Sequence, residues 1–194
     1  MGVLSGLENM NDGGYDYNLL NKVKYISSVS GVGFAIGYYL SKYSDYLHNT
    51  ISSGISKKKP FSFGNVVASD IFTSDGLNAN LQKEFGNLSN KGKFKYQLVL
   101  NNTFLRREGD LPSLRLGDIF ISKESSRKAQ LPLWITNSSI FQNFAVLPFT
   151  PDMLKRYKID GYFVGNQFVA LDDVNKLPMS FAVAASASTP VIFP

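Results

Sequence analysis

The alternation of apolar and polar residues near the start of the chain predicts a strand that turns directly into a helix. A run that favours β structure, Val23 to Ile26, leads through a corner of serine and glycine residues into an apolar segment with helical spacing. Ser30 occupies this corner. The helix is expected to continue to about Asn49, with one buried stripe of residues spaced three and four apart. The stripe consists of Val32, Ile36, Tyr39, Leu40, Tyr43 and Leu47.

The remaining apolar runs predict further helices and strands of an α/β domain. We expect helices around residues 3–7, at residues 152–157 and within residues 177–190, and strands at residues 93–100, 131–136, 144–149 and 162–171. The strand at 131–136 carries the only tryptophan and ends in the polar residues Asn137 to Ser139. Functional loops of open α/β sheets lie at such carboxyl ends. Two glycines of the first long helix, Gly33 and Gly37, are expected to let it pack closely on the sheet.

The composition is that of one globular domain spanning residues 1–194. Hydrophobic residues make up 44% and charged residues 18%, and the length suits one core rather than two. The longest apolar stretch, Val32 to Leu40, is far shorter than the roughly 18 residues of a membrane span. The first residues lack the charged segment of a secretory signal, and Gly6 breaks the myristoylation pattern. We expect a protein that is soluble or peripheral to a membrane, and its compartment stays open.

Charge and residue usage narrow the possible partners. The absence of cysteine excludes disulfides and thiolate chemistry, and a single histidine leaves little for a metal, so no cofactor is expected. A net charge of +5 and a pI near 9.3 are compatible with an anionic phospholipid surface and with nucleic acid. Only this charge supports a nucleic-acid role, so no nucleic-acid partner is expected. Three lysines, Lys57 to Lys59, form either a solvated face or a patch for lipid headgroups.

The Ser30 corner has the arrangement that acyl-transfer enzymes use for a serine nucleophile. A sharp turn from strand to helix exposes the corner side chain beside the positive end of the helix. The hydroxyl of Ser30 can then attack a carbonyl, while the backbone N–H of Gly31 binds the oxyanion that forms. The usual frame, G-x-S-x-G, has glycines where this chain has Ser28 and Val32. By spacing alone, the corner can also be a serine-rich loop without chemistry.

The only histidine is too far away to serve as the base for Ser30. If the predicted helix continues to His48, a rise of about 1.5 Å per residue places that side chain about 27 Å from Ser30 along the axis. This argues against a Ser-His-Asp triad within the chain. Serine chemistry here would require a carboxylate or a lysine as the base.

Five segments, in their order along the chain, resemble the patatin-like phospholipases. They are Gly2 to Glu8, Tyr25 to Gly31, Leu131 to Asn137, Phe149 to Pro151 and Leu177 to Pro190. The family has a G-V-L-x-x-L-E helix, a serine corner, a strand that returns to the site and, beside that strand, an A-V-x-A-S-x-x-x-P segment. That last segment is the most specific part of the resemblance. The Ser-Gly order of the corner is also similar to cytosolic phospholipase A relatives, in which G-x-S-G-S replaces G-x-S-x-G.

The resemblance implies a fold, an activity and one site residue. The fold would be a three-layer α/β domain, with a mostly parallel central sheet flanked by helices. The activity would be hydrolysis of acyl esters of lipids by a Ser-Asp dyad without a metal, with phospholipid or another acyl-ester lipid at a membrane surface as the partner. Ser30 matches the nucleophile of the family pattern.

Two parts of the family pattern have no counterpart in the sequence. The G-G-G-x-R/K loop, which donates oxyanion N–H groups, precedes the G-V-L helix, and here Gly2 is almost the first residue. The catalytic aspartate belongs to a D-G-G/A motif after the A-V-x-A-S-x-x-x-P segment, and the sequence stops at Pro194. The Asp-Gly pairs at Asp12, Asp75 and Asp160 all precede that segment and are interpreted as turns.

Two hypotheses follow from these departures. The first is an interior part of a patatin-like acyl-ester hydrolase, truncated at both ends, whose aspartate lies outside the chain. The alternative is a catalytically inactive patatin-like domain that binds lipid or another partner.

Overall fold

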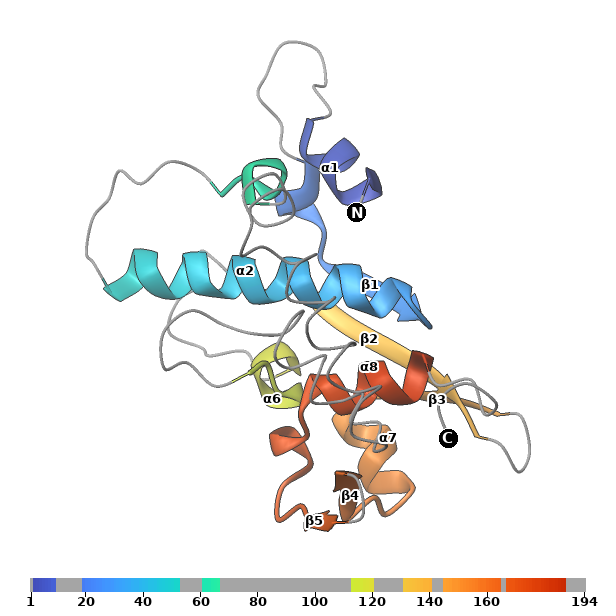
Figure 1. Cartoon of the computed structure of the whole chain (residues 1–194). Helices are drawn as coiled ribbons and strands as arrows, with labels where there is room; N and C mark the ends of the chain where they lie inside the picture. The colour runs from blue at the N-terminus through green and yellow to red at the C-terminus, as the bar shows by residue number, and fades with distance from the viewer. Residues whose placement is uncertain are drawn as a thin grey trace, which may run out of the picture.

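The computed structural model describes residues 2–9, 19–52, 61–66, 113–120, 131–140, 145–164 and 167–187 (Figure 1). Its elements are α1 (Gly2–Asn9), the 3-10 helix η1 (Leu19–Lys22), β1 (Tyr25–Val29), α2 (Val32–Ser52), α6 (Leu116–Phe120), β2 (Leu133–Ser139), β3 (Val146–Pro148), α7 (Pro151–Arg156), β4 (Gly161–Val164), β5 (Gln167–Ala170), the 3-10 helix η2 (Val174–Lys176) and α8 (Met179–Ala187). The strand expected at residues 93–100 and the three lysines at 57–59 lie outside the described residues.

Three strands form a sheet in the order β1, β2, β3. β1 runs parallel to β2, with a register from Tyr25 opposite Leu133 to Val29 opposite Asn137. β3 runs antiparallel to β2. The prediction of a mixed helix and strand architecture is therefore confirmed. A strand lies at both predicted places, but β2 begins at Leu133 and continues through the polar residues to Ser139. Because β1 and β2 are parallel and in register, the residues that follow Val29 lie beside the polar end of β2.

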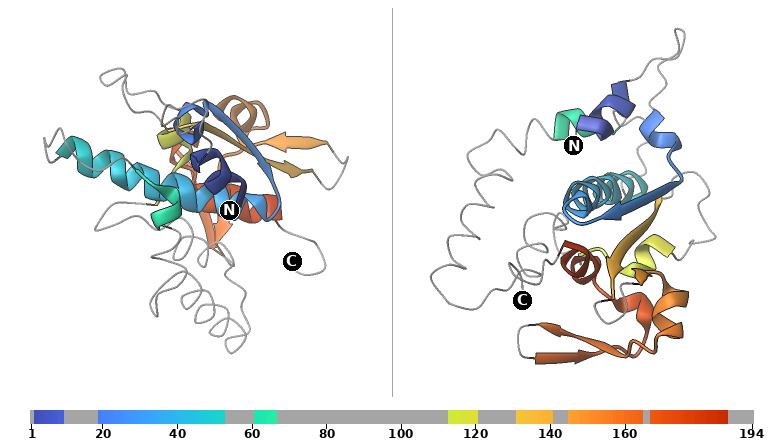
Figure 2. Two further views of the ribbon diagram at one scale, coloured as in Figure 1. Left: turned by 90° about the horizontal axis from the view of Figure 1, so that it is seen from above. Right: turned by 90° about the vertical axis from the view of Figure 1, so that its right-hand side faces the viewer.

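Helices lie on both sides of this sheet. Figure 2 shows α2 and α8 on one side and α6 and α7 on the other. The predicted close approach of Gly33 involves α8 as well as the sheet. A Cβ atom at this glycine would lie 3.2 Å from Cγ1 of Val183 on α8 and 3.8 Å from Oγ of Ser28 on β1. The start of α2 is thus wedged between the sheet and the last described helix.

The buried face of α2 is broader than one stripe. Ile36, Tyr39 and Leu40 are buried as predicted, but Tyr38 is buried as well. The prediction is wrong for Val32, which is 56% exposed because it lies in the first turn, at the edge of the sheet. The ring of Tyr39 packs edge-on against Phe63 and stacks on Tyr43, with centroids 5.5 and 5.8 Å apart. Phe63 also packs edge-on against Tyr38, which lies outside the predicted stripe, with ring centroids 6.2 Å apart. An aromatic cluster of Tyr38, Tyr39, Tyr43 and Phe63 therefore covers this side of α2.

The first helix brings the start of the chain to this aromatic cluster. Leu4 of α1 is buried, whereas Val3 is exposed because one short helix buries only one face. The carboxylate of Glu8 accepts hydrogen bonds from the backbone N–H groups of Phe63 (2.5 Å) and Gly64 (2.7 Å). It caps a helical turn at residues 63–66 and so fixes that turn against α2.

The single strand expected at residues 162–171 is instead a hairpin of β4 and β5. Tyr162 turns inward and packs on Phe181 of α8, with ring centroids 5.3 Å apart. Phe163 and Phe168 pair across the hairpin on its exposed face. A Cβ atom at Gly161 would lie 2.2 Å from the Phe168 ring, so that ring fills the space a side chain would need. The alternating pattern continues through both strands, which is why it did not separate them.

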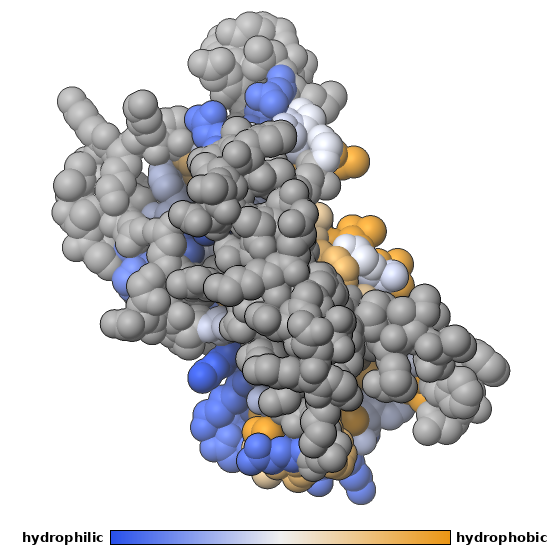
Figure 3. Space-filling view, in the orientation of Figure 1, coloured by the Kyte–Doolittle hydropathy of each residue, from blue (hydrophilic) through white to orange (hydrophobic). Residues whose placement is uncertain are grey.

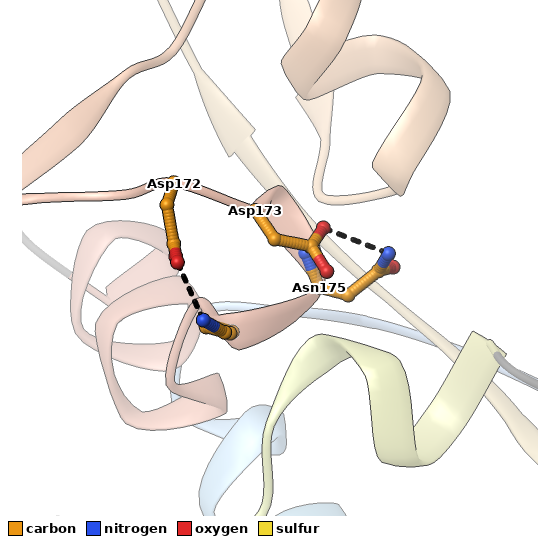
Figure 4. Close-up of polar contacts among 4 residues, drawn as sticks. Asp172, Asp173 and Asn175 are labelled. Atoms are coloured by element: carbon orange, nitrogen blue, oxygen red, sulfur yellow. Dashed lines mark hydrogen bonds and ion pairs between the residues drawn. The ribbon is translucent and has the colours of Figure 1, made fainter.

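A short polar turn leads from the hairpin into α8. Asp173 caps η2 by accepting a hydrogen bond from the backbone N–H of Asn175 at 3.0 Å, and it also accepts from that residue's side-chain amide (Figure 4). Asp172 pairs with Lys176 at 2.6 Å, and this hydrogen bond lowers the pKa of the exposed Asp172 carboxyl. These contacts fix the backbone just before Leu177, from which α8 starts toward the end of β2.

Tyr39 makes the stability of the fold sensitive to alkaline pH. Its ring is fully buried, and its hydroxyl has no hydrogen-bond partner among the described residues. Burial, with smaller contributions from Tyr43 and Glu8, raises the pKa of Tyr39 far above its ordinary value. The folded chain holds this proton more tightly than the unfolded chain. The contribution of Tyr39 to the free energy of unfolding is therefore complete below about pH 9, and it is lost as the pH rises through about 10 and above.

We expect Tyr39→Phe to flatten this alkaline loss without lowering stability at pH 7, because it removes a hydroxyl without a partner. Urea unfolding measured between pH 7 and 11 checks both effects. Tyr25→Phe is the matched control, since it removes the same hydroxyl from an exposed ring. Equal alkaline losses in wild type and Tyr39→Phe would contradict the prediction.

Candidate active site

Ser30 lies at the turn that joins β1 to α2, as the sequence predicted. It follows Val29, the last residue of β1, and precedes α2 by one residue. Its φ of 56° places it in the left-handed region, which disfavours residues that carry a Cβ atom. The turn is closed by hydrogen bonds from the N–H of Gly33 to the carbonyl of Ser30 (3.0 Å) and from the N–H of Phe34 to that of Gly31 (3.2 Å). The residue is exposed.

Gly31 lies at the positive end of the 21-residue helix α2. Among the described residues, none accepts a hydrogen bond from its backbone N–H. Apart from Gly31 and its two neighbours in sequence, no atom of the described residues lies within 4 Å of the position that a Cβ at Gly31 would take, so the space beside it is open in this part of the structure. An anionic oxygen next to Ser30 would therefore meet an unpaired donor and the end of a helix dipole.

A hydrogen-bond network joins the corner to the carboxyl end of β2. The side-chain amide of Asn137 donates to Oγ of Ser27 (3.0 Å) and to the carbonyl of Ser28 (3.2 Å). The backbone carbonyl of Asn137 accepts a hydrogen bond from Oγ of Ser186 at 2.5 Å. The same Oγ accepts from the backbone N–H of Ser30 at 2.8 Å. Ser186 of α8 thus holds the Ser30 backbone directly, and Asn137 of β2 holds both Ser186 and the end of β1.

The sequence indicated part of this network. The polar end of β2 was expected to lie near functional loops, and Asn137 does lie beside the corner. The resemblance placed the A-V-x-A-S-x-x-x-P segment, whose serine is Ser186, beside the serine corner, and Ser186 does contact the Ser30 backbone. Spacing within the sequence did not indicate this contact, because the two residues lie 156 positions apart.

Ser28 occupies the position where the G-x-S-x-G frame has its first glycine. Its side chain is only 4% exposed, and its Oγ accepts a hydrogen bond from Nε1 of Trp134 at 2.8 Å. The buried hydroxyl therefore has a partner. At the second glycine position, the exposed Val32 side chain points away from the core. Ser28 and Val32, which replace the two glycines of G-x-S-x-G, are therefore both compatible with the observed turn.

Apolar side chains flank the corner. Val29, immediately before Ser30, is 59% exposed, and Val32 lies two residues after it. Figure 3 shows apolar atoms at the right-hand edge of the molecule, where α2 begins. Two exposed apolar side chains therefore lie within two residues of Ser30 in the sequence.

The other candidate residues lie elsewhere. α2 is continuous from Val32 to Ser52, so His48 is on the same helix as the corner but near its far end. Asp160 directly precedes β4, and its carbonyl accepts a hydrogen bond from the N–H of Leu171, which follows β5, so Asp160 extends the pairing of the hairpin instead of forming a turn. Asp12 and Asp75 lie outside the described residues.

In the described part of the chain, no group of three or more histidine, aspartate or glutamate side chains is placed to hold a metal ion. None of the described helices combines the length and the apolar character needed to span a bilayer.

Comparison with family models, curated proteins and solved structures gave no significant match to this chain.

Proposed function

We propose that this chain is part of a patatin-like lipid acyl-ester hydrolase in which Ser30 is the nucleophile. The observation that carries the proposal is the exposed, left-handed Ser30 between a parallel strand and a long helix. A serine held at such a turn has its hydroxyl clear of both elements. The strained conformation is otherwise unfavourable for a serine, and such strain is concentrated at functional sites.

The proposed reaction uses the groups at the corner in sequence. Oγ of Ser30 attacks the ester carbonyl, and the N–H of Gly31 donates to the oxyanion. An aspartate outside these 194 residues accepts the serine proton and passes it to the leaving alcohol. Water then hydrolyses the acyl-enzyme. Val29 and Val32 would contact the acyl chain, which favours a lipid ester over a polar one.

The finer architecture belongs to the same proposal. The parallel pair β1 and β2, with helices on both sides, would be the centre of a larger, mostly parallel sheet of three-layer type. In such sheets, sites form beyond the carboxyl ends of the strands, where Ser30 and Asn137 lie.

Labelling of the complete gene product with a serine-directed fluorophosphonate tests the nucleophile. We expect one labelled site, mapped by mass spectrometry to Ser30 and absent in Ser30→Ala. Ser139→Ala is the matched control, because it removes an exposed serine hydroxyl from the end of β2. Labelling that persists in Ser30→Ala would contradict the assignment of Ser30 as the nucleophile. A folded wild-type protein that binds phospholipid vesicles but is never labelled would support the inactive lipid-binding alternative instead.

A further inference from the structure

We propose that Ser186 is a positioning residue that holds the backbone of Ser30 in its reactive conformation. This inference rests on the proposed function. Its basis is the Ser186 bridge, the pair of hydrogen bonds from the Ser30 N–H to Oγ of Ser186 and from that Oγ to the Asn137 carbonyl. The hydroxyl of Ser186 is thus both acceptor and donor between two segments of the sheet edge.

The Ser186 bridge acts on the residue whose backbone is strained. At φ 56°, a serine returns readily to the β or right-handed helical region unless its surroundings prevent this. The bridge fixes the plane of the peptide that precedes the Ser30 Cα atom. Because α2 is held by its packing after the corner, a change in φ would have to turn the Ser30 N–H away from Ser186. Loss of the bridge would therefore let the corner relax and displace the nucleophile.

The Ser186 bridge also gives the backbone amides of Ser30 and Gly31 different roles. The Ser30 N–H is used in the bridge, whereas the Gly31 N–H has no acceptor among the described residues. An incoming oxyanion would therefore find the Gly31 donor free and the Ser30 donor occupied. Without Ser186, both amides would point to solvent with no fixed orientation, which weakens electrostatic preorganisation.

Packing of α8 determines where Ser186 lies. Val183, one turn earlier, fills the space beside Gly33 of α2. The hydroxyl of Ser138 on β2 donates to the carbonyl of Ala185 at 2.9 Å. α8 is thus attached to α2 and β2 by contacts that do not include Ser186. Removal of the Ser186 hydroxyl should leave the helix in place and affect mainly the corner.

Three variants of the complete gene product separate positioning from stability. Ser186→Ala removes the bridge, Ser186→Thr keeps a hydroxyl, and Ser138→Ala removes a different hydrogen bond between α8 and β2. We expect Ser186→Ala to slow fluorophosphonate labelling and to lower kcat on a short-chain ester roughly 10- to 100-fold, with KM little changed. Ser186→Thr should recover most of this loss. Ser138→Ala should match Ser186→Ala in urea stability but keep the wild-type rate.

Hydrogen exchange of the Ser30 amide gives a readout that does not depend on catalysis. Exchange should be faster in Ser186→Ala and unchanged in Ser138→Ala. If the wild-type protein is labelled at Ser30 and Ser186→Ala is labelled equally fast, the positioning role is overturned and the proposed function stands. If the wild-type protein is never labelled, both are overturned.

Discussion

Replacing Ser30 with glycine is expected to abolish ester hydrolysis while making the protein more stable. The hydroxyl is the proposed nucleophile, so its loss should reduce kcat by about 10⁴-fold or more. The left-handed φ of 56° costs a residue with a Cβ atom about 1 to 2 kcal/mol, and glycine avoids this cost. Part of the gain is offset by the greater freedom of glycine in the unfolded chain, which leaves about 0.5 to 1 kcal/mol.

Two further variants separate the loss of hydrolysis from the gain in stability. Ser30→Ala also lacks the hydroxyl but keeps the strained Cβ, so it should be equally inactive and less stable than Ser30→Gly. Lys158→Gly relieves the other left-handed position outside glycine in the described chain, at φ 54°. It should gain similar stability by urea unfolding and keep wild-type hydrolysis. A Ser30→Gly protein that is less stable than Ser30→Ala would show that the corner is not strained.

The local elements of the site could be predicted because short-range sequence patterns determine them. A β-favouring run, a serine-glycine corner and residues spaced three and four apart placed Ser30 at the turn. The buried Trp134 and the polar end of β2 followed from the apolar run and the residues after it. The α/β class followed from the same alternation.

Contacts between distant segments could not be predicted in this way. The spacing within α2 indicated one buried stripe, but burial of Tyr38 depends on residues 61–63, which pack on a second face. The break between β4 and β5 leaves the alternation unchanged, so only pairing geometry reveals it. The contact of Ser186 with Ser30 depends on how α8 packs. These features are decided by tertiary packing, on which local spacing carries no information.

The contact between Trp134 and Ser28 is expected to give the largest effect on stability. Trp134 is fully buried on β2, and its indole N–H donates to the buried Oγ of Ser28. Trp134→Phe leaves a cavity and a hydroxyl without its partner, so we expect a loss of about 2 to 4 kcal/mol. Ser28→Ala leaves the indole N–H unpaired, with an expected loss of about 1 to 3 kcal/mol.

The double variant should lose about 1 to 2 kcal/mol less than the sum of the single losses, because it removes both polar partners together. Urea unfolding followed by far-UV circular dichroism measures all four proteins, since the only tryptophan is itself altered. A second double-mutant cycle, of Trp134→Phe with Ser139→Ala, is the control. Ser139 lies five residues along the same strand, about 17 Å from Trp134. That cycle should be additive. Additivity in the Trp134 and Ser28 cycle would mean that the hydrogen bond stabilises nothing, and Ser28 would then have no physical reason to stand where the family frame has a glycine.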